Sequence, residues 1–397
     1  MTIRYLFFLA LLISCSAPKS DPTYTVFTNA TLIDGSGSPP IANSVLIIQG
    51  DSIISVGSND SPIPANAKVI DLSGKFIIPG LINSHGHVGT DDALENLKRY
   101  ARYGITSVVS LGGEKRLPGP DTTLHARLYI AGEVITSLET VDKNNALGVD
   151  WMKIRVDDNL GASQKMSEDE YTAIIKRSHE LNYKIATHMY YLDDAKKLLA
   201  AGSDLMAHSV RDLPVDKEFI SLIKAKKVCY CPTLTRELST FVYGSTPDFF
   251  SDPFFTREYP DSIVAPLKDP VNQEKIRNSK SAQTYQKQLP VAMANLKTLS
   301  DEGVSIAMGT DSGIPTRFIG YFEHIEMAMM AEAGLSPMQI IRSATADAAK
   351  CMGLKNIGLL KEGYKADFVV LDENPLLDIK NTRKIDQVYI SGKKLDR

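Results

Sequence analysis

The sequence of 397 residues has few cysteines, no excess of charge of one sign and few long apolar runs. Its 44 lysine and arginine residues against 47 acidic residues give a formal net charge of −3, so no basic surface for nucleic acid is expected. Three cysteines lie beyond Cys15, at positions 229, 231 and 351, and an odd number argues against a disulfide framework. Cys229 and Cys231 are expected to be small buried residues, with a metal-binding role as the weaker alternative.

One apolar stretch, residues 5–13, follows Arg4 and ends just before Cys15. It is too short to remain as a membrane-spanning helix, so it predicts a signal peptide over residues 1–15. Residues 12–15 resemble the bacterial lipobox, which makes Cys15 the expected site of lipidation and residues 16–23 a polar tether. The expectation is an exported bacterial lipoprotein, periplasmic or membrane-anchored; an ordinary signal peptide with an incidental cysteine is the alternative.

The two ends of the remaining chain share one pattern. Residues 24–80 and 363–397 contain short β-type runs separated by Gly, Asn, Asp and Pro. Neither piece is large enough to bury a good core alone. We therefore expect both to join in one small β-sandwich domain.

Between them, residues 81–362 alternate apolar strand candidates with amphipathic helix candidates, a pattern typical of βα units. Eight strand candidates end near His87, Leu111, Ala131, Ile154, His188, His208, Leu234 and Asp311. That number predicts an α/β fold, a (β/α)8 TIM barrel, whose usual size is about 250 residues. The segment 235–288 is long and rich in aromatic residues, which predicts a lid or specificity insert.

The first strand candidate of the barrel runs directly into His85, Gly86 and His87. Residues i and i+2 of a strand point to the same side, so the two imidazoles could bind one cation. Two neighbouring histidines are often only polar surface, and this pair alone is weak evidence.

Further polar residues close the later strand candidates, and active sites of such barrels lie at the carboxyl ends of the strands. One buried histidine is usually a satisfied core residue, but a whole set at one end of a barrel is better explained as a metal site. The set consists of His85, His87, Lys153, His188, His208 and Asp311.

With these residues in place, the sequence resembles the metal-dependent amidohydrolase superfamily. The similarity is carried by the residues from Pro79 to His87, 148–154, His188, His208, 309–313, 332–337 and 363–367. It is most similar to the imidazolonepropionase-related group, which includes prolidase-like and other dipeptidases.

The resemblance implies a site for two divalent metal ions. Lys153 would have to be neutral or modified, and a carboxylated Lys153 would bridge the metals. One metal would take His85, His87, the bridging carbamate and Asp311, and the other would take the carbamate, His188 and His208. The alternative is a mononuclear site in which Lys153 only packs. Zinc is the expected metal, although manganese, cobalt or iron would suit the same ligands.

The implied reaction is hydrolysis of an amide bond by a metal-bridging hydroxide, with Asp311 as the general base and then the general acid. A dipeptide or an N-acyl amino acid is the expected substrate. A cyclic amide or lactone hydrolase is one alternative, and a non-catalytic surface binding lipoprotein is another. The oligomeric state, a homo-oligomer included, stays open.

Substrate-binding candidates are fewer. Tyr190 shares a strand face with His188 and could hydrogen-bond a substrate carbonyl, with ordinary packing as the alternative. A guanidinium could hold a substrate carboxylate, and Arg317 is the candidate chosen from a set that also contains Arg155, Arg211 and Arg236. His324 is expected to orient a metal ligand. No catalytic role is expected of His125 or His179.

Overall fold

The computed structural model describes residues 23–89, 92–117 and 124–396. The predicted signal peptide, its lipidation site Cys15 and nearly all of the predicted tether lie outside these residues. Among the described helices, none combines the length and the apolar character that crossing a membrane requires.

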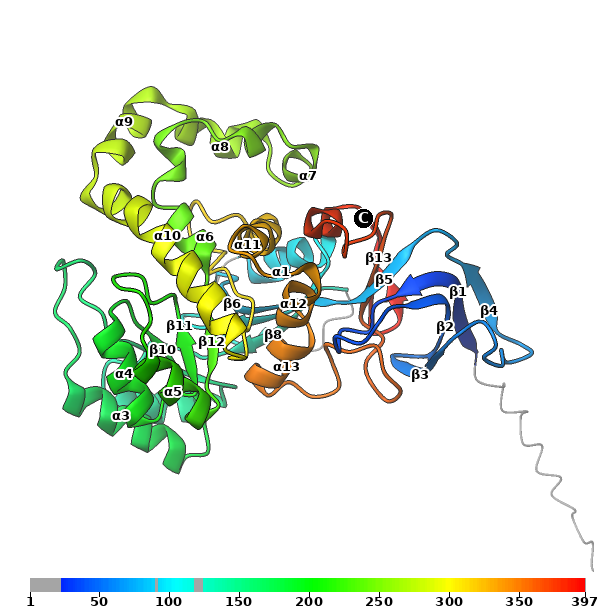
Figure 1. The fold of residues 1–397 in the computed structure, drawn as a ribbon, viewed down its shortest axis with the longest axis horizontal. Helices are drawn as coiled ribbons and strands as arrows, with labels where there is room; N and C mark the ends of the chain where they lie inside the picture. Colours follow the sequence, from blue (N-terminus) through cyan, green and yellow to red (C-terminus); the bar gives the residue numbers. More distant parts are fainter. Residues whose placement is uncertain (1–22, 90–91, 118–123, 397) are drawn as a thin grey trace, which may run out of the picture.

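The two ends of the chain share one sheet. Its hydrogen-bonded order is β15-β14-β13-β5-β1-β2-β3, with β4 paired to β1. In Figure 1 the blue N-terminal strands and the red C-terminal strands accordingly lie side by side. The strands are β1 Tyr24–Leu32, β2 Ile41–Gln49, β3 Ser52–Gly57, β4 Lys68–Asp71, β5 Phe76–Pro79, β13 Phe368–Leu371, β14 Ile385–Ile390 and β15 Lys393–Lys394.

This sheet has its own core, in which Phe27 packs edge-on against Phe368 and Tyr389 with ring centroids 5.0 Å apart in both pairs. All eight strands of this domain belong to a single hydrogen-bonded network. Strand β1 connects them, since it pairs with β2 over its whole length and with β4 and β5 along different parts of it.

The middle of the chain forms parallel strands. Strands β6 Leu81–Gly86, β7 Ile105–Ser110 and β8 Arg127–Ile130 make one sheet. A second sheet contains β9 Met152–Arg155, β10 Ile185–His188, β11 Leu205–Ala207 and β12 Cys229–Cys231. The α/β class is thereby confirmed.

The eighth predicted strand, ending at Asp311, is not a continuous strand. Isolated bridges pair Ile306 with Tyr230 of β12 and Ser312 with Gly86 of β6. A third bridge, between Ile135 and Ile154, connects the segment after β8 with β9. Backbone hydrogen bonds from Ser84 N to Met308 O and from His87 N to Ser312 O add to these links.

Helices follow most of these strands. They are α1 Ala93–Arg102, α2 Leu138–Leu147, α3 Glu168–Glu180, α4 Leu192–Ala201, α5 Lys217–Lys226, α11 Tyr321–Glu332, α12 Pro337–Ser343 and α13 Ala346–Met352, with the single turn η3 Ile379–Arg383 near the C-terminus. Local signals explain their ends: Ser167 and Glu170 form a capping box at the start of α3. Gly202 ends α4 with a φ of 109°, as its position in the sequence predicted.

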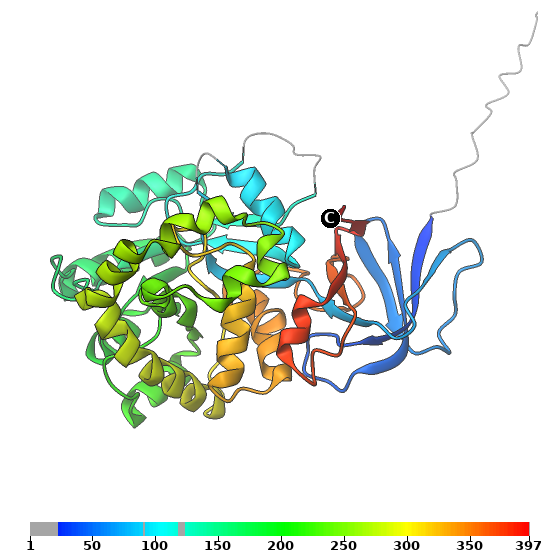
Figure 2. The same cartoon turned by 90° about the horizontal axis from the view of Figure 1, so that it is seen from above.

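The segment 235–288 is largely helical, with α6 Leu234–Leu238, η1 Val242–Gly244, η2 Asp248–Ser251, α7 Pro253–Thr256, α8 Asp261–Lys268, α9 Pro270–Asn278 and the first turns of α10 Lys280–Asp301. Helices α7 to α9 form an arch at the top of Figure 1, and the view from above in Figure 2 shows them crossing the body of the molecule. The aromatic residues of the segment 235–288 pack on the rest of the chain. The ring centroid of Phe255 lies 4.9 Å from that of Phe318 and 5.0 Å from that of Tyr321.

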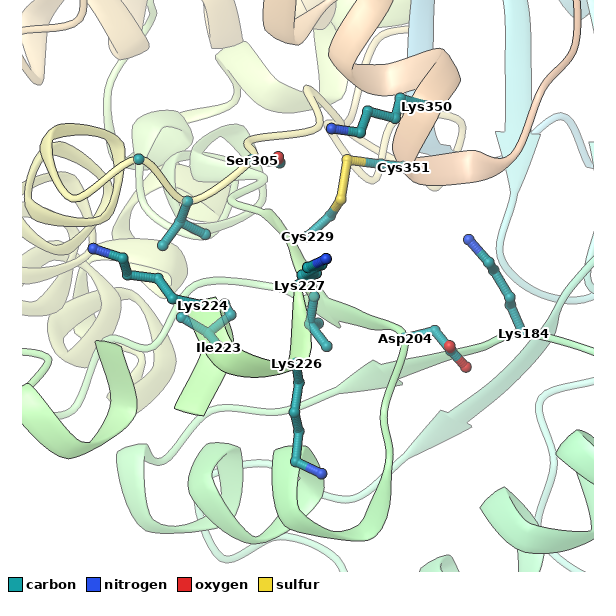
Figure 3. Close-up of a pocket in the computed structure, with 13 residues that line it drawn as sticks. Lys184, Asp204, Ile223, Lys224, Lys226, Lys227, Cys229, Ser305, Lys350 and Cys351 are labelled. Carbon is teal, nitrogen blue, oxygen red and sulfur yellow. A yellow bond between two sulfur atoms is a disulfide. The ribbon is translucent and has the colours of Figure 1, made fainter. Parts of the chain in front are cut away.

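The predicted burial of Cys229 and Cys231 is confirmed, but the prediction against a disulfide was wrong. Cys229 of β12 and Cys351 of α13 form a disulfide with Cα atoms 5.9 Å apart, and only Cys231 is a free, buried thiol among the described residues. The disulfide lines a cavity of about 530 Å³ beside Lys184, Lys227 and other lysines (Figure 3). The lining residues Lys184, Asp204 and Val228 directly precede β10, β11 and β12, so this cavity lies at the amino ends of these strands, opposite the candidate site.

Candidate metal centre

Three predicted ligands converge at the carboxyl ends of the strands. His85, His208 and Asp311 are buried and offer ligand atoms that all lie within 4.8 Å of one another. His85 comes from β6, His208 follows β11, and Asp311 lies within the segment 306–312 that bridges β12 and β6. Because these strands are parallel, their ends meet at one edge, as the sequence predicted.

Asp311 is the centre of this group. One of its carboxylate oxygens, Oδ1, lies 3.2 Å from His85 Nε2 and 3.0 Å from His87 Nε2. The other, Oδ2, accepts a hydrogen bond from Arg317 Nη1. Arg317 and His85 hold the pKa of Asp311 well below its usual range although burial alone would raise it.

The two remaining histidines lie on either side. The ring of His188 is 4.4 Å from that of His208, centroid to centroid, while its Nε2 lies 3.0 Å from Asp157 Oδ2. His87 Nδ1 lies 3.1 Å from Glu114 Oε1 and 3.2 Å from the Gly112 carbonyl oxygen. Both histidines therefore have one ring nitrogen fixed by a carboxylate, an arrangement common behind metal-binding imidazoles.

Lys153 lies on β9 and is 3% exposed. Among the residues that the structure describes, its Nζ has no hydrogen-bond partner. Burial lowers its pKa to about 8, partly offset by the nearby charge of Asp311. A buried amine that is easily deprotonated and lacks a partner fits a lysine that is carboxylated and binds metal.

The protonation states of three histidines also suit metal binding. Burial, reinforced by Lys153, lowers the pKa of His85 to about 3, and burial likewise lowers that of His188 to about 3. Burial takes the pKa of His208 well below its usual value. His87 differs: burial would lower its pKa, but the Asp311 and Glu114 carboxylates raise it to about 9. A neutral imidazole is the form that binds a metal.

Several residues of the site were missed in the sequence. Asp157 and Glu114 contact His188 and His87, and the hydroxyl of Thr233 lies 2.6 Å from His208 Nδ1. The sequence did contain a signal for Asp157. It lies two residues after Arg155 and four after Lys153, so the three residues share one face of β9 and its extension. Glu323 accepts hydrogen bonds from the side chains of Asn83 and of Thr310 and Ser312, the two residues that flank Asp311.

The three remaining predicted residues contact other groups of the chain. His324 lies 2.9 Å from the Tyr103 carbonyl oxygen and 3.0 Å from Thr382 Oγ1, so the contacts described for it do not reach the metal-ligand candidates. Arg317 binds the Asp311 carboxylate and, through Nε, Ser239 Oγ at 3.0 Å. Tyr190 is buried with its ring beneath the guanidinium of Arg211, whose Cζ lies 4.6 Å from the ring centroid.

The other histidines lie elsewhere, as expected. His179 Nε2 is 2.9 Å from Asp204, and His125 Nδ1 is 2.7 Å from the Ala126 carbonyl oxygen.

The chain was compared with protein families, with curated proteins and with solved structures. Residues 162–395 match the model of the amidohydrolase family. Among curated proteins, the 5-methylthioadenosine/S-adenosylhomocysteine deaminase of Bacillus cereus is 24% identical over 399 residues, which cover 88% of this chain and 85% of that protein.

Similar solved structures include a Xaa-Pro dipeptidase with bound methionine, at 18% identity and a TM-score of 0.73, covering 94% of this chain and 100% of that one. A prolidase complexed with N-methylphosphonate-L-proline gives 21% identity and a TM-score of 0.74 with the same coverage. At these identities the structural likeness shows that the fold is shared.

Proposed function

The chain belongs to the amidohydrolase family, and from this premise we propose that it is a binuclear metal-dependent hydrolase that cleaves the amide bond of a dipeptide or an N-acyl amino acid. The observation that supports it most strongly is the buried Nζ of Lys153, which has no hydrogen-bond partner in the described part of the chain, beside the group of His85, His208 and Asp311. A (β/α)8 barrel is part of the proposal, supported by the bridges that connect residue 135, after β8, to β9, residue 306 to β12, and residue 312 to β6.

Each site residue has a role in this proposal. His85, His87, Lys153 as its carbamate, His188, His208 and Asp311 would hold two divalent ions, with zinc as the expected metal. When bound, the ions would supply Lewis acidity and a water that ionises near neutral pH. Among the described residues, Lys153 Nζ has no hydrogen-bond partner. Carboxylation would convert this amine into a carbamate, whose two oxygens would bind the metal ions.

Asp311 would move the proton. Its pKa is held low, so the carboxylate is ionised and can accept a proton from the attacking water at Oδ1 or Oδ2. It would then deliver that proton to the leaving amine. Arg317, which binds Oδ2, would orient the carboxylate rather than bind substrate. The hydroxyl of Tyr190 remains a candidate donor to the substrate carbonyl, but the packing of its ring against Arg211 supports a structural role as well.

Export and lipidation at Cys15 are also part of the proposal. The disulfide between Cys229 and Cys351 supports them, because such bonds persist in oxidising compartments. Incorporation of radiolabelled palmitate into the wild-type protein, and its loss in Cys15→Ser, would establish the anchor. A wild-type protein that takes up no label would contradict it.

Metal analysis and a substrate panel test the central proposal. The purified chain should hold about two metal ions and hydrolyse some members of a set of dipeptides and N-acyl amino acids. The panel also needs cyclic amides, lactones and an adenine nucleoside, because the same site could attack a ring carbonyl and because curated relatives are deaminases. Asp311→Asn should abolish turnover, whereas the surface variant Arg177→Met should not.

Three results would count against the proposal. Turnover of only the cyclic amides and lactones, or of only the nucleoside, would show that the substrate class is not a dipeptide or an N-acyl amino acid. One metal ion per chain with full activity would favour the mononuclear alternative. Metal-loaded protein without any hydrolase activity would favour the alternative of a non-catalytic binding lipoprotein.

A further inference from the structure

Two buried arginines near the metal centre share one carboxylate. Arg211 Nε lies 3.0 Å and Arg236 Nη1 lies 3.4 Å from the same oxygen, Oε1 of Glu237. Arg211 and Glu237 are 0% exposed, and Arg236 is 7% exposed. Because a guanidinium stays protonated in proteins, this cluster carries one positive charge more than its carboxylate neutralises.

Aromatic rings complete the cluster. The guanidinium of Arg236 lies 4.5 Å from the ring centroid of Tyr285, and that of Arg211 lies 5.6 Å from the same ring and 4.6 Å from Tyr190. Ring faces attract cations but do not neutralise them. Within the described part of the chain, Arg211 Nη2 and Glu237 Oε2 are buried without a hydrogen-bond partner.

The chain brings Arg236 to the metal centre. Thr233 contacts His208, and Thr235 Oγ1 donates a hydrogen bond to the carbonyl oxygen of Thr310, the residue before Asp311. Arg236 is the next residue of α6. Its charge acts on His188, and the charge of Asp311 acts on it.

The other arginines proposed from the sequence are held by different groups. Arg317 binds the Asp311 carboxylate, and Arg155 binds Asp157 with Nε 2.9 Å from Oδ1. Arg211 is fully buried and donates to the backbone carbonyl oxygens of Met189 and Ser209. Arg236 differs from these three: it lies beside the site, it is 7% exposed, and its hydrogen bond to a carboxylate, from Nη1 to Glu237 Oε1, is long at 3.4 Å.

From these contacts we propose that Arg236 binds the free carboxylate of the substrate, with Glu237 and Tyr285 holding its guanidinium in place. The inference rests on the proposed hydrolysis of a dipeptide or N-acyl amino acid and assigns the group that selects such substrates. A carboxylate would neutralise the excess charge of the cluster and fit the planar donor pair of a guanidinium. Substrates without this carboxylate would be poor.

The test compares a substrate that has the carboxylate with one that lacks it. The best dipeptide for the wild-type enzyme and its C-terminal carboxamide are assayed with wild type, Arg236→Met, Arg236→Lys and the surface control Arg177→Met. The ratio of kcat/KM for acid over amide should be roughly 100 or more in wild type and in Arg177→Met. It should fall to near 1 in Arg236→Met and to an intermediate value in Arg236→Lys, which keeps the charge but not the planar fork.

A binding measurement separates failure of this inference from failure of the proposed function. Titration calorimetry of the product amino acid into the metal-loaded full chain should show affinity at least tenfold weaker in Arg236→Met than in wild type. If Arg236→Met does not fold, the same comparison is made with Arg236→Lys. A wild-type enzyme that cleaves acid and amide equally, or an Arg236 variant that keeps the full preference, would overturn the inference while the hydrolase stands. If the chain shows no turnover at all, amino acid binding that depends on Arg236 still supports the inference. If the amino acid does not bind to wild type, the inference is overturned.

Discussion

His188 Nε2 lies 3.0 Å from Oδ2 of Asp157, whose side chain is 1% exposed. A carboxylate in this position fixes the orientation and the tautomer of the imidazole, so that the other ring nitrogen is free to bind a metal. Asp157 is in turn held by Arg155 at 2.9 Å. The pair links the end of β9 with the end of β10.

Asp157→Asn should therefore weaken metal binding. Removing the carboxylate behind a metal-binding histidine typically costs about 10- to 100-fold in affinity or activity. Metal titration with a competing chelator measures this directly. Asp158→Asn is the matched control, because Asp158 accepts a hydrogen bond from Tyr191 and not from His188. Equal metal affinities in the two variants would mean that Asp157 does not orient a ligand.

The strand ends made the candidate ligands predictable from the sequence. His85, His188 and Asp311 each close an apolar run, and parallel strands bring such ends together whatever the intervening helices do. What Arg317 and His324 contact depends on tertiary packing, which the sequence pattern does not show. Arg317 turns toward Asp311, and His324 faces Tyr103 and Thr382.

Long-range pairing was the other failure. Cys229 and Cys351 are 122 residues apart, and only the packing of α13 beside β12 brings them together. An odd number of cysteines cannot exclude one bond among them. The eighth strand also depends on its neighbours, because residues near Ile306 touch β12 through isolated bridges instead of a continuous ladder.

In the proposed binuclear site, Lys153→Ala should lose the group that would bridge the two metals. We expect the variant to hold about one metal ion and to lose roughly 100-fold or more of kcat, since both metals stabilise the transition state. Added short carboxylates such as formate or acetate should restore part of the activity by occupying the place of the carbamate. Lys184→Ala is the control, because this lysine lies over the ring of Trp151 at the other end of the strands. A Lys153→Ala enzyme with two metals and normal turnover would disprove the bridging role.

The double variant Cys229→Ser, Cys351→Ser should be less stable than wild type. Closing a loop of this length constrains the unfolded chain and is worth about 3 to 5 kcal/mol. Urea unfolding of the full chain with the metal content held constant measures the difference. Cys231→Ala keeps the disulfide and tests the effect of a buried thiol alone. The bond carries no stability if wild type unfolds at the same urea concentration with and without reductant.

Glu326 joins α11 to the start of α6 and should make stability depend on pH. It is 0% exposed and accepts hydrogen bonds from Leu234 N and Thr235 N, each at 2.8 Å. Burial raises its pKa to about 8 from a model-peptide value of 4.5, although these hydrogen bonds oppose the shift. Between these two values the folded chain holds a proton that the unfolded chain has lost.

Stability from Glu326 is thus greatest below about pH 4.5 and declines as the pH rises toward about 8, by at most roughly 1.4 kcal/mol per pH unit. Glu326→Gln removes the titration, so the free energy of unfolding of wild type relative to this variant should fall from pH 5 to pH 8 and level off above. Urea unfolding at several pH values gives this difference, and contributions from all other groups cancel. Glu332→Gln, at the exposed end of the same helix, should show no such trend. A difference that is constant with pH would mean that Glu326 is ionised in the folded chain and that its hydrogen bonds to α6 outweigh its burial.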